Sequence, residues 1–398
     1  MRVVHLVDPT TGDDAFSMLT MLLERAAPEQ RQHHILLYGN VSLEKCFGNT
    51  PRTRADAPVG PGVAPGSPAS VKFIRNIAAL DPHAWHAVGK TCAPLNPDIF
   101  HAWGVPSMLA AGMQGGCGAV ATLAAPLPQR QWNTVRSLLM RPNRPMFLVT
   151  NSKALHHLAL SHGVPAQTTT VINQGIAMGG VGGDADARAN LRRRLGLDAA
   201  AGPIICLPPP YVPAARHDHG LWAAGILREI LPGSRVILPP APAGPHGAPA
   251  RHALRRTAHF ANHLSHPDMV LMPPNFTWQD ILAVSDICLC AADGPIPTGA
   301  ILQAMAAGVP LVATAIACIA EIAENQFNAL LSPPGQPRAL AARLEELAAD
   351  PSLASPLVDK ARREIFMHHK PRVMVEQYDA LYARAQTSVG TSATEAQT

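Results

Sequence analysis

The segment Gly299-Ala300-Ile301-Leu302-Gln303-Ala304-Met305-Ala306-Ala307-Gly308-Val309-Pro310-Leu311-Val312-Ala313-Thr314 decides the fold. It predicts a buried helix followed by a short strand. Gly308 can adopt the left-handed conformation that ends a helix, and Pro310 cannot continue one. The apolar run from Leu311 to Thr314 then predicts a strand. This order of elements is typical of a parallel α/β sheet.

Short apolar runs of the same kind alternate with helical stretches along the whole chain. The alternation predicts an α/β fold with two Rossmann-like, doubly wound domains in tandem. The predicted strands of the first half are Val3–Val7, Ile35–Tyr38, Ile99–Ala102, Ala119–Leu123, Phe147–Thr150 and Thr170–Ile172. Those of the second half are Ile204–Leu207, Arg235–Leu238, Met269–Met272, Ile287–Cys290 and Leu311–Thr314.

Glycine and proline content sets the expected domain limits. Residues 174–183 hold five glycines and few large side chains, a composition that favours a hinge. We therefore expect an N-terminal domain over 1–173, a hinge over 174–200 and a second domain over 201–365. Residues 366–386 should form a last helix that returns to the first domain. The segment 52–67 and the small polar tail 387–398 are expected to be irregular.

Composition excludes several classes of function. The chain has 398 residues, 47% of them apolar and 15% charged, with a net charge of +4. No basic block is interleaved with aromatic residues, so we expect no nucleic-acid partner. No run reaches the roughly 18 apolar residues of a spanning helix, and we expect a cytoplasmic protein, with peripheral membrane contact left open. The seven cysteines lack metal-type spacing and should be reduced core residues.

Several segments resemble, in the same order, those of the retaining glycosyltransferases of family 4. The segment 299–314 resembles that family's Leu-Glu-Ala-Met-Ala-x-Gly-x-Pro-Val-Val-Ala-Thr motif, with Gln303 in place of the acid. The other matching segments are Pro97–Gly104, Val149–Ala154, Val171–Ile176, Ala320–Ile322 and Asn328–Gly335. The resemblance implies the GT-B fold: two Rossmann-like domains facing a cleft, with a glycan acceptor on the N-terminal side and a nucleotide sugar on the C-terminal side. It implies neither a metal nor another cofactor.

The resemblance also indicates where the diphosphate of a donor would lie. The family has an Arg and a Lys after the first strand of its second domain, whereas this chain has Pro208–Pro213 there. The nearest replacements are Arg216, His217 and His219. Arg216 could donate two hydrogen bonds to a phosphate, or it could be a residue of a solvated loop. A helix that begins near Thr298 and Gly299 would direct its N–H groups at the diphosphate.

Acidic residues of the family's donor site are also replaced. The family's Glu-x7-Glu pair falls on Pro295 and Gln303, and an amide at 303 can still hydrogen-bond ribose hydroxyls. Asp293 would reach the first acid's place if the loop were two residues longer, and otherwise is a turn residue. Glu321, in the segment that resembles Pro-Glu-Ile-Val, is a further donor-side candidate.

The acceptor side of the resemblance is weaker. Thr122-Leu123-Ala124 stands where the family often has Thr-x-His, and the loop Thr10–Asp13 keeps one glycine, Gly12, of the usual pair. Gly12 and His101 are the acceptor-side candidates, and no catalytic residue is assigned. Two functions therefore stay open. The chain is either a working transferase with an altered donor site or a non-catalytic relative that binds a glycan, a nucleotide or a protein.

Overall fold

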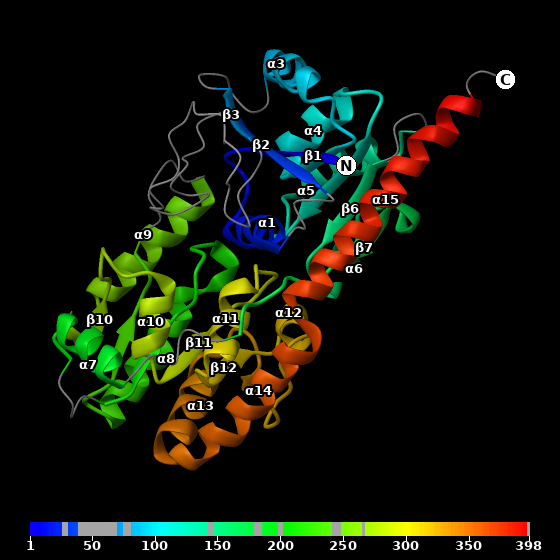
Figure 1. The fold of residues 1–398 in the computed structure, drawn as a ribbon. Coiled ribbons are helices and arrows are strands. Elements are labelled where there is room, and N and C mark those ends of the chain that lie inside the picture. Colours follow the sequence, from blue (N-terminus) through cyan, green and yellow to red (C-terminus); the bar gives the residue numbers. More distant parts are fainter. Residues whose placement is uncertain are drawn as a thin grey trace. The chain divides into compact units, whose positions relative to one another are not determined.

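The computed structural model describes residues 1–25, 31–38, 70–74, 81–141, 146–178, 185–197, 202–240, 248–264 and 267–395. The chain divides into two compact units. Unit 1 comprises Met1–Gly175 and Pro371–Thr398, and unit 2 comprises Ile176–Lys370. Each unit contains one parallel sheet with helices on both faces (Figure 1). The segments 52–67 and 179–183 of the sequence prediction lie outside the described residues.

Within the described residues, the sheet of unit 1 has seven strands in the order β3-β2-β1-β4-β5-β6-β7. Six of them were predicted within one to three residues, and β3 was not. β3 is an edge strand whose first four residues are only half-buried, so its apolar alternation is weak. The strands are β1 (Arg2–Val7), β2 (Gln32–Tyr38), β3 (Ser70–Ile74), β4 (Ile99–Trp103), β5 (Gly118–Leu123), β6 (Met146–Thr150) and β7 (Thr169–Val171).

Successive side chains of these strands point to opposite faces, and each face has its own core. Val4 and Leu6 of β1 pack under α3, α4, α5 and α6, whereas Val3 and Val7 pack under α1 and α15. The helices are α1 (Asp13–Arg25), α3 (Pro82–Cys92), α4 (Val105–Met113), α5 (Gln129–Leu139), α6 (Lys153–Ser161) and α15 (Pro371–Glu395), with 3-10 turns η1 (Ala93–Leu95) and η2 (Ala166–Thr168).

The last helix, α15, completes unit 1. It lies along β5 (Figure 1). Its buried Tyr378 and Tyr382 are hydrogen-bonded to Thr122 of β5 and His101 of β4. Gly118 permits the close approach, because a Cβ at this position would meet the Ala385 carbonyl oxygen at 2.7 Å. α15 continues to Glu395, so the segment predicted as an irregular tail is helical up to that residue.

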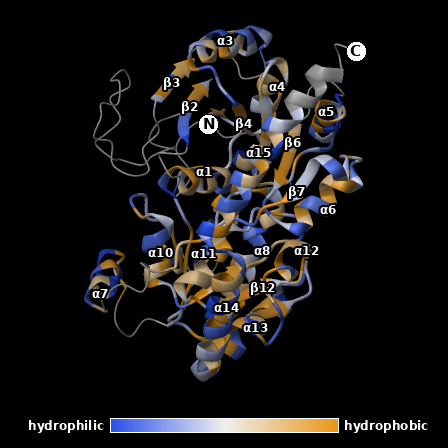
Figure 2. Ribbon diagram, turned by 45° about the vertical axis from the view of Figure 1, so that its right-hand side comes forward, coloured by the Kyte–Doolittle hydropathy of each residue, from blue (hydrophilic) through white to orange (hydrophobic). Residues whose placement is uncertain are grey.

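In the part of unit 2 that the structure describes, the sheet has six strands in the order β10-β9-β8-β11-β12-β13. Five of these strands were predicted, and β13 was not. It is only three residues long and is followed by two prolines, so its sequence shows too little apolar pattern to indicate a strand. The strands are β8 (Ile204–Cys206), β9 (Arg235–Ile237), β10 (Val270–Leu271), β11 (Ile287–Cys290), β12 (Leu311–Thr314) and β13 (Leu330–Ser332). Their side chains are mostly apolar, whereas the covering helices mix apolar and polar residues (Figure 2).

Helices cover both faces of this second sheet. α8 and α13 pack on one face around Leu221, Leu227 and Leu344, while α10 and α11 contact the strands outside that core. The helices are α7 (Ala185–Arg194), α8 (His217–Ile230), α9 (Ala248–Asn262), α10 (Trp278–Val284), α11 (Gly299–Ala307), α12 (Ala317–Ala320), α13 (Pro337–Ala349) and α14 (Ala354–His368), with 3-10 turns η3 (Pro213–Ala215), η4 (Pro267–Met269) and η5 (Pro351–Leu353).

The segment 299–314 folds as its sequence predicts. Gly308 ends α11 with φ of 83°, and β12 begins at Leu311. The segment 174–200, predicted as a hinge, contains the helix α7. Arg188 of that helix donates to Asp286 at 2.6 Å, which ties α7 to the start of β11. The division between the units therefore lies at Gly175 and Ile176.

The cysteines of the described part are free thiols, and most lie in the cores, as the sequence predicts. Burial raises the pKa of the Cys290 thiol to about 12, so it is protonated at neutral pH. Across the described residues, no helix is both long and apolar enough to cross a bilayer.

Candidate functional site

The topology of unit 2 locates a candidate site at the carboxyl edge of its sheet. β8 and β11 are neighbours, but α8 leaves β8 toward one face and α11 leaves β11 toward the other. Ligands of open α/β sheets bind where the direction of winding changes in this way. The loop between β8 and α8 and the loop between β11 and α11 border this point.

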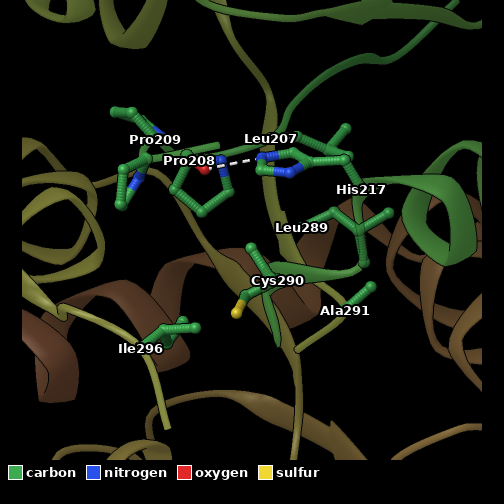
Figure 3. A pocket seen from close by; sticks show the side chains of 10 residues that line it. Leu207, Pro208, Pro209, His217, Leu289, Cys290, Ala291 and Ile296 are labelled. Carbon is green, nitrogen blue, oxygen red and sulfur yellow. Dashed lines mark hydrogen bonds between the residues drawn. The ribbon is translucent and has the colours of Figure 1, made fainter. Parts of the chain in front are cut away.

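A narrow apolar slot lies between these two loops (Figure 3). Ring and aliphatic carbon atoms form most of its walls. The lining residues are Leu207, Pro208, Pro209, Pro210, Ala215, His217, Leu289, Cys290, Ala291 and Ile296.

His217 brings a polar group to this slot. Its Nε2 lies 3.0 Å from the Pro208 carbonyl oxygen, so Nε2 carries the proton and donates. Burial lowers the pKa of His217 to about 4, so the ring is neutral at pH 7. Its Nδ1 is then an acceptor, and it has no partner among the residues that the structure describes. His217 is one of the nearest sequence replacements for the family's Arg and Lys, although it was not among the donor-binding candidates.

A cluster of charged side chains lies beside the slot. Arg216 Nη1 donates to Asp293 Oδ2 at 2.5 Å, and Arg216 Nε and Nη2 donate to Asp218 at 3.1 and 3.2 Å. Arg216 Nη2 also contacts His219 Nε2. Arg256 from α9 donates to Asp218 at 3.2 Å. The structure thus brings together three predicted candidates, Arg216, His219 and Asp293.

The charges within this cluster compensate one another. Burial alone would raise the pKa of Asp218, but the two guanidinium groups lower it, so Asp218 is ionised. Burial and the neighbouring Arg216 lower the pKa of His219, which is therefore neutral at pH 7. Two arginines face two aspartates, and the cluster offers a diphosphate no net positive charge.

The backbone at Arg216 is unusual. Arg216 has φ of 47° and ψ of 48°, a left-handed conformation that costs a residue with a side chain roughly 1 kcal/mol. It joins η3 to α8, and the neighbouring Ala214 carbonyl accepts a hydrogen bond from the Asp293 N–H at 3.0 Å. The two loops are therefore joined by a backbone bond and by the Arg216–Asp293 ion pair.

The remaining donor-side candidates follow neighbouring strands. Thr298 and Gly299 are buried at the start of α11, and the Thr298 side chain does not cap the helix. Gln303 is half-buried one turn farther along α11, and Glu321 ends α12, which follows β12. All four come from the carboxyl edge of the same sheet, and their contact with a ligand stays a prediction.

A second change of winding direction occurs in unit 1, between β1 and β4. α1 follows β1 on one face, and α4 follows β4 on the other. Gly12 is exposed there, with open space where a Cβ would lie. This placement suits a residue that lets a ligand approach the backbone closely, although no contact tests it.

Asp8, at the end of β1, was not predicted from the sequence. Its buried carboxylate accepts from the backbone N–H of Thr10 and of Ser107, at 2.8 and 3.0 Å, and from both hydroxyl groups. Gly104 leaves room for this group, since a Cβ would meet Asp8 Oδ2 at 2.9 Å. The sequence signal that could have identified Asp8 is its position as an acidic residue directly after the buried strand β1. Asp8 holds the loop before Gly12 against α4.

His101 lies in the interior of unit 1. Its Nδ1 is hydrogen-bonded to Tyr382 Oη at 2.6 Å and its Nε2 to Thr122 Oγ1 at 2.8 Å. Both ring nitrogens are engaged and the side chain is fully buried. His101 therefore connects β4 to α15, and its position gives no support to an acceptor-binding role.

Comparison with known proteins agrees with this architecture. Residues 244–350 match the family model of the group 1 glycosyl transferases. N-acetyl-alpha-D-glucosaminyl L-malate synthase of Bacillus anthracis is 26% identical over 103 residues, which are 26% of this chain. The match spans 27% of that curated relative's length.

Solved structures resemble the whole chain. HepE of Anabaena, in complex with UDP and glucose, gives a TM-score of 0.78 at 16% identity, over 96% of this chain and 99% of that one. Sucrose-phosphate synthase of Thermosynechococcus elongatus gives 0.73 at 16% identity, over 98% and 100%. At these identities the likeness shows the fold. The chain thus has the GT-B fold of the group 1 glycosyltransferases and carries their sequence signature over residues 244–350.

Proposed function

We propose that this chain is a glycosyltransferase-like protein that binds a nucleotide sugar at the carboxyl edge of unit 2. The observation that carries the proposal is the apolar slot between the β8 and β11 loops, at the change of winding direction. In this proposal a nucleobase packs against the apolar walls of the slot. The buried His217 Nδ1 accepts a hydrogen bond from an N–H or O–H of the ligand. UDP is the first nucleotide to test, because the structural neighbour HepE was crystallised with it.

The chemistry of such a transfer sets what the site must do. The bond between the anomeric carbon and the diphosphate breaks, a bond from the anomeric carbon to an acceptor hydroxyl oxygen forms, and the hydroxyl proton passes to the released diphosphate. Negative charge builds up on the released diphosphate and must be stabilised. In this chain the N–H groups at the start of α11 and the guanidinium of Arg216 are the groups proposed for that task.

We place a glycan acceptor at the carboxyl edge of unit 1, where Gly12 is exposed and Asp8 holds the neighbouring loop. The proposed location is the cytoplasm, in keeping with the free thiols of the described cysteines.

Titration calorimetry with UDP tests the donor site, and release of UDP from UDP-glucose tests transfer to water. Absence of UDP binding up to the millimolar range would contradict the proposal.

A second candidate function is a non-catalytic relative that binds a glycan, a nucleotide or a protein. The observation that favours it is the engagement of Arg216 by two carboxylates, which removes the charge that a diphosphate needs. Each charge-assisted hydrogen bond contributes roughly 1.5–3 kcal/mol, so losing two weakens binding about a hundredfold or more. UDP binding without turnover of UDP-glucose, or of other nucleotide sugars tried in turn, would favour this function.

A further inference from the structure

We propose that Asp293 is an internal competitor of the donor diphosphate: it occupies Arg216 when no ligand is bound and thereby weakens nucleotide binding. The inference rests on the proposed function, because it concerns the same site. It assigns Asp293 a role in setting the affinity for the nucleotide. The role follows from how the Arg216 guanidinium divides its hydrogen bonds between two carboxylates.

The two edges of the guanidinium have different partners. Nε and Nη2 form a side-on fork with the two oxygens of Asp218, at 3.1 and 3.2 Å. Nη1, on the remaining edge, donates to Asp293 Oδ2 at 2.5 Å. Asp218 therefore fixes the orientation of the Arg216 side chain, and Nη2 also contacts His219 Nε2. Asp293 occupies Nη1, the donor for which a phosphate oxygen would compete.

The two carboxylates also differ in charge balance and burial. Asp218 accepts a further hydrogen bond from Arg256, and its side chain is 13% exposed. Asp293 faces Arg216 alone among the described cations, and its side chain is 34% exposed. Arg256 thus compensates Asp218, and Asp293 neutralises Arg216. The exposed partner is the one that a ligand can displace, because water can solvate the released carboxylate.

Removing the Asp293 charge should convert the cluster into an anion site. Arg216 would keep its fork with Asp218, and Nη1 would become available without a change of rotamer. The net charge of the cluster would rise from zero to one positive charge. A preoriented guanidinium binds phosphate more tightly than one that must first leave a carboxylate.

The test is titration of UDP into the full-length protein and its Asp293→Asn variant, at low ionic strength. Asn keeps the shape of the side chain and removes its charge. The matched control is Asp268→Asn, because Asp268 is likewise an aspartate ion-paired with arginine, here Arg228 and Arg235, but lies at the opposite edge of the sheet. The double variant Arg216→Ala/Asp293→Asn tests whether a gain depends on Arg216. A circular dichroism melt of each variant verifies folding.

We expect Asp293→Asn to bind UDP at least tenfold more tightly than the wild type, Asp268→Asn to bind it equally, and the double variant to lose the gain. Equal or weaker binding of UDP by a folded Asp293→Asn would overturn the inference, while wild-type UDP binding would leave the proposed function standing. If Asp293→Asn binds UDP as the wild type does but binds UDP-glucose more weakly, Asp293 contacts the sugar instead. That outcome also overturns the inference. If no variant binds UDP, the inference and the proposed function both fail.

Discussion

The indole N–H of Trp103 donates to Nδ1 of His5 across 3.1 Å in the core of unit 1. This bond fixes the tautomer of two histidines. Because Nδ1 of His5 accepts, its proton is on Nε2, which donates to Nδ1 of His33 at 2.8 Å. His33 then carries its own proton on Nε2. Neither ring can bind a second proton without losing one of these bonds.

The first prediction is that unit 1 loses stability as the pH falls below about 6.5. Burial lowers the pKa of His5 and His101 well below 6.5, and that of His33 to about 4. The unfolded chain binds these protons near pH 6.5, so stability is fully present above that pH and decreases as the pH falls toward 4. Each histidine contributes about 1.4 kcal/mol per pH unit.

Urea unfolding followed by tryptophan fluorescence at several pH values measures this change. A variant of an exposed histidine, His86→Asn, should keep the same pH dependence, since His86 lies on the outer face of α3. A free energy of unfolding that is constant between pH 7.5 and 5 would contradict the prediction.

The second prediction concerns the bond between α15 and the sheet. Tyr382→Phe removes the hydroxyl that contacts His101 Nδ1 at 2.6 Å and leaves a buried ring nitrogen without a partner. We expect a loss of about 1–3 kcal/mol in the free energy of unfolding. Hydrogen exchange should become faster in α15. Unchanged exchange in that helix would show that the hydrogen bond does not hold it.

The third prediction uses two glycines of unit 1. Gly118→Ala would place a Cβ 2.7 Å from the Ala385 carbonyl oxygen, so α15 would have to move away from β5. We expect a destabilisation of roughly 1–3 kcal/mol, measured by thermal or urea unfolding. Gly12→Ala is the control, because nothing lies within 4 Å of its Cβ position. Equal effects of the two substitutions would refute the explanation.

The fourth prediction concerns the end of α11. Gly308→Ala forces a Cβ into a left-handed conformation with φ of 83°, and the Arg362 side chain occupies the space beside it. Unit 2 should lose about 1–2 kcal/mol of stability. Gly225→Ala, in the middle of α8, is a suitable comparison, because its Cβ would meet only the Leu264 side chain at 3.4 Å. A larger loss from Gly225→Ala would contradict this account.

Local signals predicted most of the fold. The helix, glycine, proline and strand of 299–314 form as expected, because capping and burial act within a few residues. The edge strand β3 and the short β13 carried too little pattern. α7 was missed because its sequence is polar and its ion pair with Asp286 comes from a distant part of the chain.

The site was harder to predict than the fold. The sequence pointed to Arg216 and Asp293 separately, but their ion pair joins residues 77 positions apart and depends on both loops. The strand motif around His101 predicts an acceptor-side residue, because it resembles one that carries a histidine. In the structure the side chain is hydrogen-bonded to Tyr382 of α15, which lies 281 positions farther along the chain. The sequence pattern around one residue does not indicate its contacts with residues far away in the chain.

The return of α15 to unit 1 has a consequence for synthesis on the ribosome. Val120 and Val149 of the first sheet pack under this helix, which is translated after unit 2. Unit 1 is begun first and cannot be completed until Pro371 and the residues after it have left the exit tunnel, whereas unit 2 is continuous and can fold before then. A nascent chain stalled before residue 371 would therefore expose apolar surface on a sheet that is otherwise finished, and chaperones would have to shield it.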